Sequence, residues 1–377
     1  MEKINWQKIG LEKPPSQTRV VVAMSGGVDS SVTAALLAEA GFEVVGITLQ
    51  LYDHGMAIEK KNACCAGQDI YDAKQVAEKL GFPHYVLDYE SRFNSAVIDD
   101  FADTYLKGET PIPCVRCNQT VKFRDLLETA QDLQADALVT GHYVQRHVGP
   151  TGAELHRALD PAKDQSYFLF ATSQDQLDYL RFPLGGMDKT TTRRYAQRFN
   201  LSVAEKPDSQ DICFVPAGKY ADLVAKLRPE SLIPGHIVHQ NGQILGAHQG
   251  IINFTVGQRK GLGIGGRTED TDPLYVIELN PQTHEVIVGP KESLARQAFT
   301  LESVNWLGSP GQESVPCTVK IRSTHTPVRA HVSLLPNKRA SVRLEEPEFG
   351  LSPGQACVFY EGTRVLGGGW ISATEKR

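Results

Sequence analysis

The feature that most constrains the fold is a short apolar run that leads through a glycine-rich hexapeptide into a helical pattern. Residues Thr18 to Met24 read TRVVVAM, a β-branched segment typical of a buried strand. The hexapeptide SGGVDS follows at Ser25 to Ser30, and Ser31 to Ala40 have a helical pattern that ends before Gly41. A strand, a glycine turn and a helix in this order predict the first unit of a parallel α/β sheet.

Strand and helix patterns go on alternating over the first 215 residues. Further strands are predicted at 42–49, 84–87 and 135–140, and further helices at 68–80, 91–106 and 120–133. This alternation predicts an α/β fold, a doubly wound, Rossmann-like parallel sheet covered on both faces. Ligands of such sheets bind beyond the carboxyl ends of the strands. The hexapeptide and Gly141-His142-Tyr143 both follow predicted strands, so we expect them at the ligand-binding edge.

The pattern changes after about residue 215. Gly and Pro separate short β-rich runs, and Asn241-Gly242 is a strong signal for a hairpin turn. Short alternating strands are predicted within 317–323, 329–335, 339–345 and 356–370. We therefore predict three domains: an α/β domain at 1–215, a small central mixed domain at 216–290 and a C-terminal β-barrel at 291–377.

Composition narrows the class of protein. Hydrophobic residues make up 41% of the chain and charged residues 22%, which excludes a disordered or fibrous chain. There is no apolar run of about 18 residues and no secretory leader pattern, so we expect no membrane association. Seven cysteines without a leader predict reduced thiols and a cytoplasmic protein. From residue 291 onward 11 Lys and Arg face 8 Asp and Glu, a slight basic excess that indicates either a polyanionic partner or ordinary surface variation.

The hexapeptide has the chemistry of a phosphate-binding loop. Gly26 and Gly27 allow a sharp turn that presents bare N–H groups, and the following helix adds the positive end of its dipole. The side chains of Ser25, Asp29 and Ser30 can bind phosphate oxygens, cap the helix or hold Mg²⁺. No Lys-Ser or Lys-Thr pair follows, so this is not a Walker A loop. A plain turn with a serine cap is the alternative, but the whole hexapeptide in this context favours phosphate binding.

Cysteines are the second source of chemistry. Cys114 and Cys117 lie three residues apart after a proline-rich approach, and Arg116 and Lys122 are near enough in sequence to stabilise a thiolate. Such a pair can be a redox pair, a metal clip or buried filler. A structural zinc site usually has a second ligand pair, and the sequence offers none with that spacing. We therefore predict a catalytic thiol within 114–117, with Cys213 as a third thiol of interest.

These motifs resemble a known family. The hexapeptide is similar to the pyrophosphate loop of ATP pyrophosphatases, which implies cleavage of ATP between its α and β phosphates and adenylation of a substrate oxygen. The chain resembles the tRNA-specific 2-thiouridylases over nearly its whole length. The resemblance is carried, in order, by SGGVDSSV, TPIPCVRCN with VKF, TGHY, KDQSYFL, DICF, HQG, GQRKGLGIGG, SPGQACVFY and LGGG. It implies replacement of the C2 oxygen of the wobble uridine by sulfur, with ATP and Mg²⁺, by a pyrophosphate-loop domain, a central domain and a β-barrel.

The resemblance also implies roles for individual residues. Cys117 matches the nucleophile and Cys213 the persulfide carrier, and a transient disulfide can form between them. Matches to ATP-binding positions are Ala23, Met24, Ser25, Gly26, Gly27, Val28, Asp29, Ser30, Leu49 and Gly141. Matches to the segment beside the target base are Ile112, Pro113 and Cys114. Matches to tRNA-contacting positions are His142, Lys163, Asp164, Gln165, Arg322, Ser323 and Gln355. The implied partners are the tRNA anticodon arm and an upstream sulfur-relay or cysteine desulfurase protein.

One departure leaves the sulfur route open. Many members of the family carry Asp where this chain has Cys114. Cys114, Cys117 and Cys213 are therefore three candidate ligands of an iron–sulfur cluster with one open iron site, although we favour a persulfide. Rival functions are another pyrophosphate-loop ligase of the argininosuccinate or GMP synthetase type, an RNA-binding module that uses ATP structurally, and a thiolase of the uridine at position 8.

Overall fold

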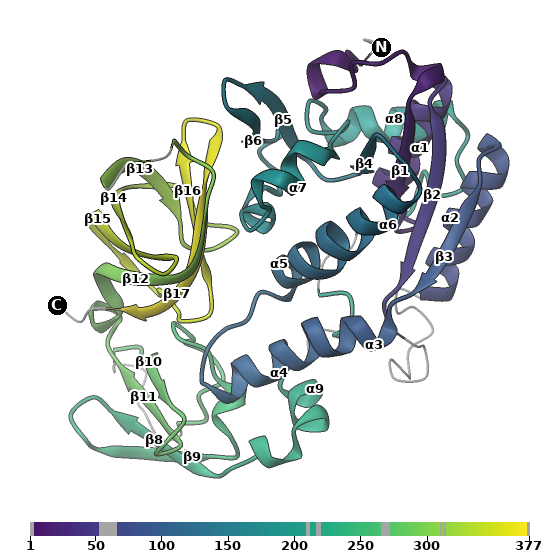
Figure 1. Ribbon diagram of the computed structural model, residues 1–377. Helices are drawn as coiled ribbons and strands as arrows, with labels where there is room; N and C mark the ends of the chain where they lie inside the picture. Colours follow the sequence, from purple (N-terminus) through teal and green to yellow (C-terminus); the bar gives the residue numbers. More distant parts are fainter. Residues whose placement is uncertain are drawn as a thin grey trace. The chain divides into compact units, whose positions relative to one another are not determined.

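The computed structural model (Figure 1) describes residues 4–52, 66–208, 212–215, 220–264, 272–309, 311 and 314–374. The chain divides into two compact units that are each described by themselves. The first unit comprises residues 1–97, 114–217 and 362–366, and the second comprises 98–113, 218–361 and 367–377. The three-domain division expected from the sequence remains a prediction.

A parallel sheet forms the centre of the first unit. Its strands, in spatial order, are β3 (His84–Asp88), β2 (Glu43–Gln50), β1 (Arg19–Ala23), β4 (Ala137–Thr140) and β7 (Leu180–Arg181). All neighbouring strands run parallel. Val20, Val21 and Val22 of β1 are each fully buried, as expected of a central strand that is covered on both faces. The predicted α/β fold is confirmed.

Helices cover both faces of this sheet (Figure 1). Val20 and Val22 belong to a core that also contains buried residues of α1 (Val28–Ala40), α2 (Ala66–Leu80) and α8 (Lys189–Arg198). On the other face α6 (Leu126–Asp132) packs against β4. The α1 helix begins three residues before the predicted start, inside the hexapeptide, and ends at Gly41, whose φ of 88° suits a left-handed cap.

Two helices predicted as continuous are interrupted. Over 91–106 the structure has α3 (Glu90–Phe93), a π-helical turn and then α4 (Asp99–Leu106). The second prediction, 120–133, begins too late, because α5 (Pro113–Cys117) and a π-helical segment (Asn118–Asp125) precede α6. A π-helical turn adds one residue to the helical repeat and so changes which side chains face the core. Apolar periodicity read at a constant 3.6 residues misses this change.

Several further elements lie between the predicted ones. They are the hairpin of β5 (Val144–Gly149) and β6 (Gly152–Arg157), α7 (Gln174–Tyr179) and α9 (Tyr220–Leu227). The α7 helix begins with a capping box between Ser173 and Gln176, a signal that is readable in the sequence. Arg364, in the late segment assigned to the first unit, pairs with His156 of β6.

The second unit is mainly β structure. One sheet has the order β10 (Tyr275–Asn280), β11 (Glu285–Gly289), β8 (Gly235–His239) and β9 (Ile244–His248). The hairpin predicted at Asn241-Gly242 is confirmed, since β8 and β9 pair antiparallel across it and Gly242 has a φ of 92°. Apolar residues of these strands, including Ile237, Val276 and Val286, form a common core.

The predicted C-terminal barrel is confirmed. Its strands follow the order β12 (Ala295–Trp306), β15 (Arg339–Phe349), β14 (Val328–Leu335), β13 (Ser314–Lys320), β16 (Ala356–Glu361) and β17 (Arg364–Thr374). Antiparallel pairing of β12 with β17 closes the barrel. Helices long and apolar enough to cross a membrane are absent from the described part of the chain.

Candidate active site

The glycine loop lies at the carboxyl end of β1, and two of its close approaches require glycine. Gly26 has a φ of 70°, and a Cβ there would lie 2.1 Å from the carbonyl oxygen of Asp69 at the start of α2. Gly141 follows β4, and a Cβ there would lie 2.8 Å from the backbone nitrogen of Ser30. The loop after β1 is thus packed against the backbone of α2, and the turn after β4 is packed against the start of α1. A larger side chain at Gly26 would push the loop away from α2, and one at Gly141 would push the turn away from α1.

The start of α1 has free donors for an anion. The N-cap is Gly27, which offers no side-chain cap, so the first N–H groups of the 13-residue helix keep their hydrogen-bonding capacity. Ser30 Oγ accepts a hydrogen bond from the Ser25 N–H at 3.1 Å and donates to the Gly27 carbonyl at 3.3 Å. This bonding holds the loop open around its backbone donors, an arrangement that fits a phosphate group.

The Asp29 side chain is hydrogen-bonded to side chains from other elements of the first unit. Its carboxylate accepts hydrogen bonds from the Tyr143 hydroxyl at 2.8 Å and from Lys189 Nζ at 2.8 and 2.9 Å. With its proton donated to Asp29, the Tyr143 hydroxyl oxygen accepts a hydrogen bond from Thr192 Oγ1 at 2.9 Å. The loop carboxylate is thereby connected to β4 and to α8. Lys189 lies in an ordinary polar stretch, and no sequence motif marks it as part of the site.

A cluster of cations surrounds the loop. Asp208 makes ion pairs with Lys163 at 2.7 Å, Lys189 at 2.8 Å and Arg193 at 3.2 Å. Burial raises the pKa of Asp208, but hydrogen bonds and charges from Lys163 and Lys189 outweigh burial and lower that pKa to about 2. Lys189 also pairs with Asp29 at 2.8 Å, so these charges form a network of ion pairs in which cationic side chains are held beside the loop.

A further lysine binds the loop directly. Lys206 Nζ donates to the Gly26 carbonyl at 3.0 Å and pairs with Asp69 at 2.6 Å and Asp72 at 2.5 Å. It thereby fastens the loop to α2. Lys206 and Asp208 precede the DICF motif by a few residues, so their position beside a predicted site residue is the signal that could have identified them.

The turn Lys163-Asp164-Gln165, expected to contact tRNA, makes hydrogen bonds and ion pairs to residues near the glycine loop. The Asp164 side chain is only 2% exposed and accepts hydrogen bonds from Arg157 Nε at 3.1 Å and from the Ala158 N–H at 3.1 Å. Gln165 Oε1 accepts from the Tyr143 N–H at 2.8 Å. The turn therefore positions Tyr143, and Asp164 is buried although a run of polar and charged residues is usually solvent-exposed.

The cysteines of the predicted site gather in the first unit. Cys114 and Cys117 lie at either end of one turn of α5, so their side chains share a helix face; Cys114 is exposed and Cys117 is buried. Cys213 is exposed on a short turn that is anchored by the neighbouring Phe214, whose ring packs edge-on against Phe93 at 5.7 Å. These three, together with Cys317 and Cys357, are free thiols.

The three thiols influence one another electrostatically. Burial and then the nearby charges of Cys117 and Cys114 raise the pKa of Cys213 to about 12, although solvent still reaches its side chain. Burial likewise raises the pKa of Cys117, with Cys114 adding to the effect. Lys122 opposes the shift at both thiols, as the sequence predicts, but burial outweighs it. Within the described ranges no three His, Cys, Asp or Glu side chains are arranged to hold a metal ion.

The remaining predicted residues of the first unit lie at the same sheet edge. Leu49 is half-buried near the carboxyl end of β2, and Met24 is buried directly after β1. His142 bonds through Nδ1 to Thr140 Oγ1 at 2.9 Å and packs edge-on against Phe123. Burial, with a smaller contribution from Lys122, lowers the pKa of His142 to about 3, so its ring is neutral at physiological pH.

Other predicted residues belong to the second unit. Ile112 and Pro113 are buried there, at the point where the chain passes between units. Gln355 Nε2 donates to the Thr110 carbonyl at 3.1 Å, so Gln355 fixes the segment that leads to Cys114. Arg322 is exposed and Ser323 is half-buried.

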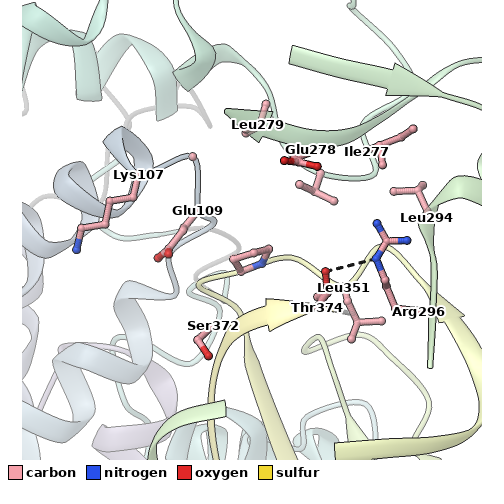
Figure 2. Close-up of a pocket in the computed structure, with 13 residues that line it drawn as sticks. Lys107, Glu109, Ile277, Glu278, Leu279, Leu294, Arg296, Leu351, Ser372 and Thr374 are labelled. Carbon is pink, nitrogen blue, oxygen red and sulfur yellow. Dashed lines mark hydrogen bonds between the residues drawn. The ribbon is translucent and has the colours of Figure 1, made fainter. Parts of the chain in front are cut away.

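A cavity of about 330 Å³ also lies within the second unit (Figure 2). Figure 2 shows Arg296 on one side of the cavity and Glu109 on the other, with Glu278 between them. Arg296 Nε donates a hydrogen bond to Thr374 Oγ1 at 3.4 Å. None of the residues that the sequence predicts for the site lines this cavity. It is therefore distinct from the loop and the thiols.

Three family models match successive parts of the chain. Residues 18–217 match the family described as tRNA methyl transferase HUP domain, 221–290 the tRNA methyl transferase PRC-barrel domain, and 296–371 the aminomethyltransferase beta-barrel domain. The region that contains the glycine loop and the three thiols is thus a HUP domain.

Full-length relatives identify the family. The chain is 63% identical over 371 residues to the tRNA-specific 2-thiouridylase MnmA of Rhodospirillum centenum, covering 97% of this chain and 95% of that protein. It is 61% identical over 368 residues to the enzyme of the same name from Paracoccus denitrificans, covering 97% and 94%. The chain therefore belongs to the tRNA-specific 2-thiouridylase family.

Solved structures that match this chain have low sequence identity and low TM-scores. The U34-tRNA thiolase NcsA from Methanococcus maripaludis with its [4Fe-4S] cluster is 16% identical, with a TM-score of 0.37 over 60% of this chain and 70% of that one. A 4-thiouridine synthetase in complex with RNA and bound ATP is 15% identical, with a TM-score of 0.36 over 56% of this chain and 52% of that one.

Proposed function

We propose that this protein uses ATP to replace the C2 oxygen of the wobble uridine of tRNA with sulfur carried as a persulfide on Cys213. One observation carries the proposal: a single compact unit contains both a glycine loop and a group of three thiols that form no disulfide. The helix that follows the loop has no side-chain cap, and Lys189 binds the loop residue Asp29. The loop can bind and orient a nucleoside triphosphate, and the thiols can transfer sulfur. Family membership supports the pairing of these two chemistries on tRNA.

The loop is proposed to prepare uridine O2 as a leaving group. The N–H groups at the start of α1 and the cations at Lys189 and Lys206 would hold the β and γ phosphates, which favours attack of O2 on the α phosphorus. Pyrophosphate leaves and an O2-adenylated uridine forms. Mg²⁺ is expected to accompany ATP and to offset phosphate charge when bound.

The thiols are proposed to complete the exchange. The terminal sulfur of the Cys213 persulfide attacks C2, the C2–O bond breaks, and AMP departs with its electron pair. The Cys117 thiolate then attacks Cys213 Sγ and displaces 2-thiouridine, which leaves a Cys117–Cys213 disulfide. Alternatively, Cys117 first releases the sulfur as hydrosulfide, which attacks C2. Either order oxidises two thiols and reduces the sulfane sulfur, so an external thiol must restore the enzyme after each turnover.

Lys122 is proposed to favour the attacking thiolate. It opposes the rise in pKa at both Cys117 and Cys213, and it is positioned by the π-helical segment that follows Cys117. The neutral His142 ring packs edge-on against Phe123, which directly follows this lysine. Ile112, Pro113 and Cys114 are proposed to receive the flipped base, and Arg322, Ser323 and Gln355 to meet the tRNA. The anticodon arm and a persulfide-donating protein are the proposed partners, in the cytoplasm.

The test is a reconstituted reaction with unmodified tRNA, ATP, Mg²⁺, cysteine and a cysteine desulfurase, followed by nucleoside mass spectrometry. Wild type should form 2-thiouridine and AMP. Cys117→Ser and Cys213→Ser should form no 2-thiouridine, whereas the matched control Cys317→Ser, a half-buried thiol of the barrel, should match wild type. Thiolation at the wild-type rate by either site variant would contradict the proposed roles.

A loop variant separates the two half-reactions. Ser30→Ala removes the acceptor of the Ser25 N–H and should reduce tRNA-dependent pyrophosphate release. The cysteine variants should retain a first turnover of pyrophosphate release, because adenylation precedes sulfur transfer. If the cysteine variants lost pyrophosphate release while the loop variant kept it, the assignment of the two steps would be reversed.

A further inference from the structure

Two buried arginines of the first unit line a cavity away from the glycine loop. Arg146 of β5 is 7% exposed and Arg181 of β7 is 8% exposed. Both line a cavity of about 390 Å³ in the first unit. Thr18 directly precedes β1 and Asp136 directly precedes β4, and both residues line the same cavity. It therefore lies at the amino-terminal edge of these strands, whereas the glycine loop follows their carboxyl ends.

The two guanidinium groups differ in how well they are bonded. Arg181 donates to the Gly10 carbonyl at 3.0 and 2.7 Å and to the carbonyls of Asp178 and Leu180 at 2.8 and 2.9 Å. Arg146 has one short bond, from Nε to the Leu177 carbonyl at 3.1 Å. Its two terminal nitrogens reach only carbonyls 3.4 Å away. The terminal nitrogens of Arg146 thus retain donor capacity where they line the cavity.

Neither arginine has a counter-ion at contact distance among the described residues. Asp178 and Glu12 line the same cavity but act on both arginines only from beyond ion-pair range. The third carboxylate of the lining, Asp136, pairs with Lys13 at 2.5 Å. Asp178 Oδ1 accepts hydrogen bonds from the Ala153 N–H at 2.8 Å and from Gln174 at 3.1 Å. Burial and then the charge of Arg146 lower the pKa of Arg181 to about 10. Buried charges in proteins are normally paired, so two adjacent cations bonded only to carbonyls are exceptional.

We infer that this cavity is a second anion site, which takes a phosphate-type oxyanion on the terminal nitrogens of Arg146. A guanidinium fork matches two phosphate oxygens, and the charge of Arg181 adds to the attraction. Glycine at position 10 leaves room for the Arg146 guanidinium, because a Cβ there would lie 2.3 Å from Arg146 Nη1. The volume accommodates a phosphate ester. The inference does not depend on the proposed function, since phosphate binding can be measured without tRNA.

Val148 allows a test that leaves the buried arginines intact. It lines the cavity and is 64% exposed, so a charged side chain there should not disturb folding. Inorganic phosphate is titrated by calorimetry into wild type, Val148→Glu, Val148→Lys and the neutral control Val148→Gln, at constant ionic strength. Leu159→Glu, also in the first unit and 62% exposed but not lining the cavity, makes the same charge change elsewhere.

The expected result is a change of opposite sign for the two charges. Val148→Glu should weaken phosphate binding by about fivefold and Val148→Lys should strengthen it by a similar factor, as a unit charge within several ångströms of the anion predicts. Val148→Gln and Leu159→Glu should match wild type. The glycine loop is the same in every variant, so phosphate bound there adds an equal background. Equal phosphate affinity in the Glu, Lys and Gln variants would overturn the inference.

A second arm identifies the source of the phosphate. If the cavity takes a phosphate of the tRNA backbone, Val148→Glu should also weaken tRNA binding and reduce the slope of log K against log salt by about one. If it takes free phosphate or pyrophosphate, tRNA binding should stay unchanged while phosphate binding responds as above. Either result retains an oxyanion site.

Discussion

Replacing Asp208 by Asn tests the cation cluster beside the glycine loop. The Asp208 side chain is 23% exposed and pairs with Lys163, Lys189 and Arg193. Hydrogen bonds and charges from the two lysines overcome burial and lower its pKa from 3.8 to about 2. One pKa unit corresponds to about 1.4 kcal/mol, so ionised Asp208 should contribute about 2 kcal/mol to the free energy of unfolding.

The pH dependence gives this prediction its sign. Because the folded-state pKa is lower than the unfolded one, the contribution is complete above about pH 4 and disappears as the pH falls through 2. Asp208→Asn should therefore lower the free energy of unfolding by about 2 kcal/mol at pH 7 and by less than about 1 kcal/mol at pH 2.5.

The assay is urea denaturation of wild type and variant at both pH values. Asp132→Asn, an exposed acid near the end of α6, is the matched control and should change stability little at either pH. An equal loss of stability for Asp208→Asn at pH 7 and at pH 2.5 would refute the electrostatic account, because a packing defect does not depend on the ionisation of residue 208.

Four further outcomes follow from individual contacts. Tyr143→Phe removes the hydroxyl that donates a hydrogen bond to Asp29. It should lower the free energy of unfolding, measured by urea denaturation, by about 1 kcal/mol and should raise KM for ATP; if neither value changed, this hydrogen bond would not hold the loop carboxylate in place. Glu109→Gln should stabilise the protein at pH 8 but not at pH 4, because burial raises the pKa of Glu109 and so penalises only the ionised form; thermal unfolding at the two pH values checks this. Single-turnover thiolation should accelerate from pH 7 to pH 9, because burial raises the pKa of Cys117 and few of these thiols are ionised at neutral pH; a flat profile would contradict thiolate attack. Cys114→Asp, prepared in air and free of iron, should still form 2-thiouridine in the nucleoside assay; complete inactivity would favour a cluster route.

The sequence predicts the parallel sheet and the place of the loop well, because both depend on local signals. β-branched runs mark β1 and β2, and two glycines mark the turn into α1. The same holds for Asn241-Gly242, where a left-handed backbone selects the residue types. Such features need no knowledge of distant partners.

The cation cluster could not be predicted in the same way. Lys189 lies in a polar helix and meets Asp29, which is 160 positions away in the sequence, only after folding. Similarly, Asp164 looks like part of a charged turn but is buried by its bonds to Arg157 and to neighbouring backbone N–H groups. The pairing of charges across the fold is decided by tertiary structure, on which the sequence pattern around each residue carries no information.

The most direct test of the proposed sulfur transfer is the mass of the peptides that contain Cys117 and Cys213. The protein is loaded with a cysteine desulfurase and cysteine, freed of both, and then given unmodified tRNA and ATP without a reductant. The account predicts one added sulfur on Cys213 before ATP, and afterwards its loss with one 2-thiouridine per protein and a disulfide that joins the two peptides. Formation of 2-thiouridine with no sulfur ever carried on Cys213, and with both thiols still reduced, would contradict it.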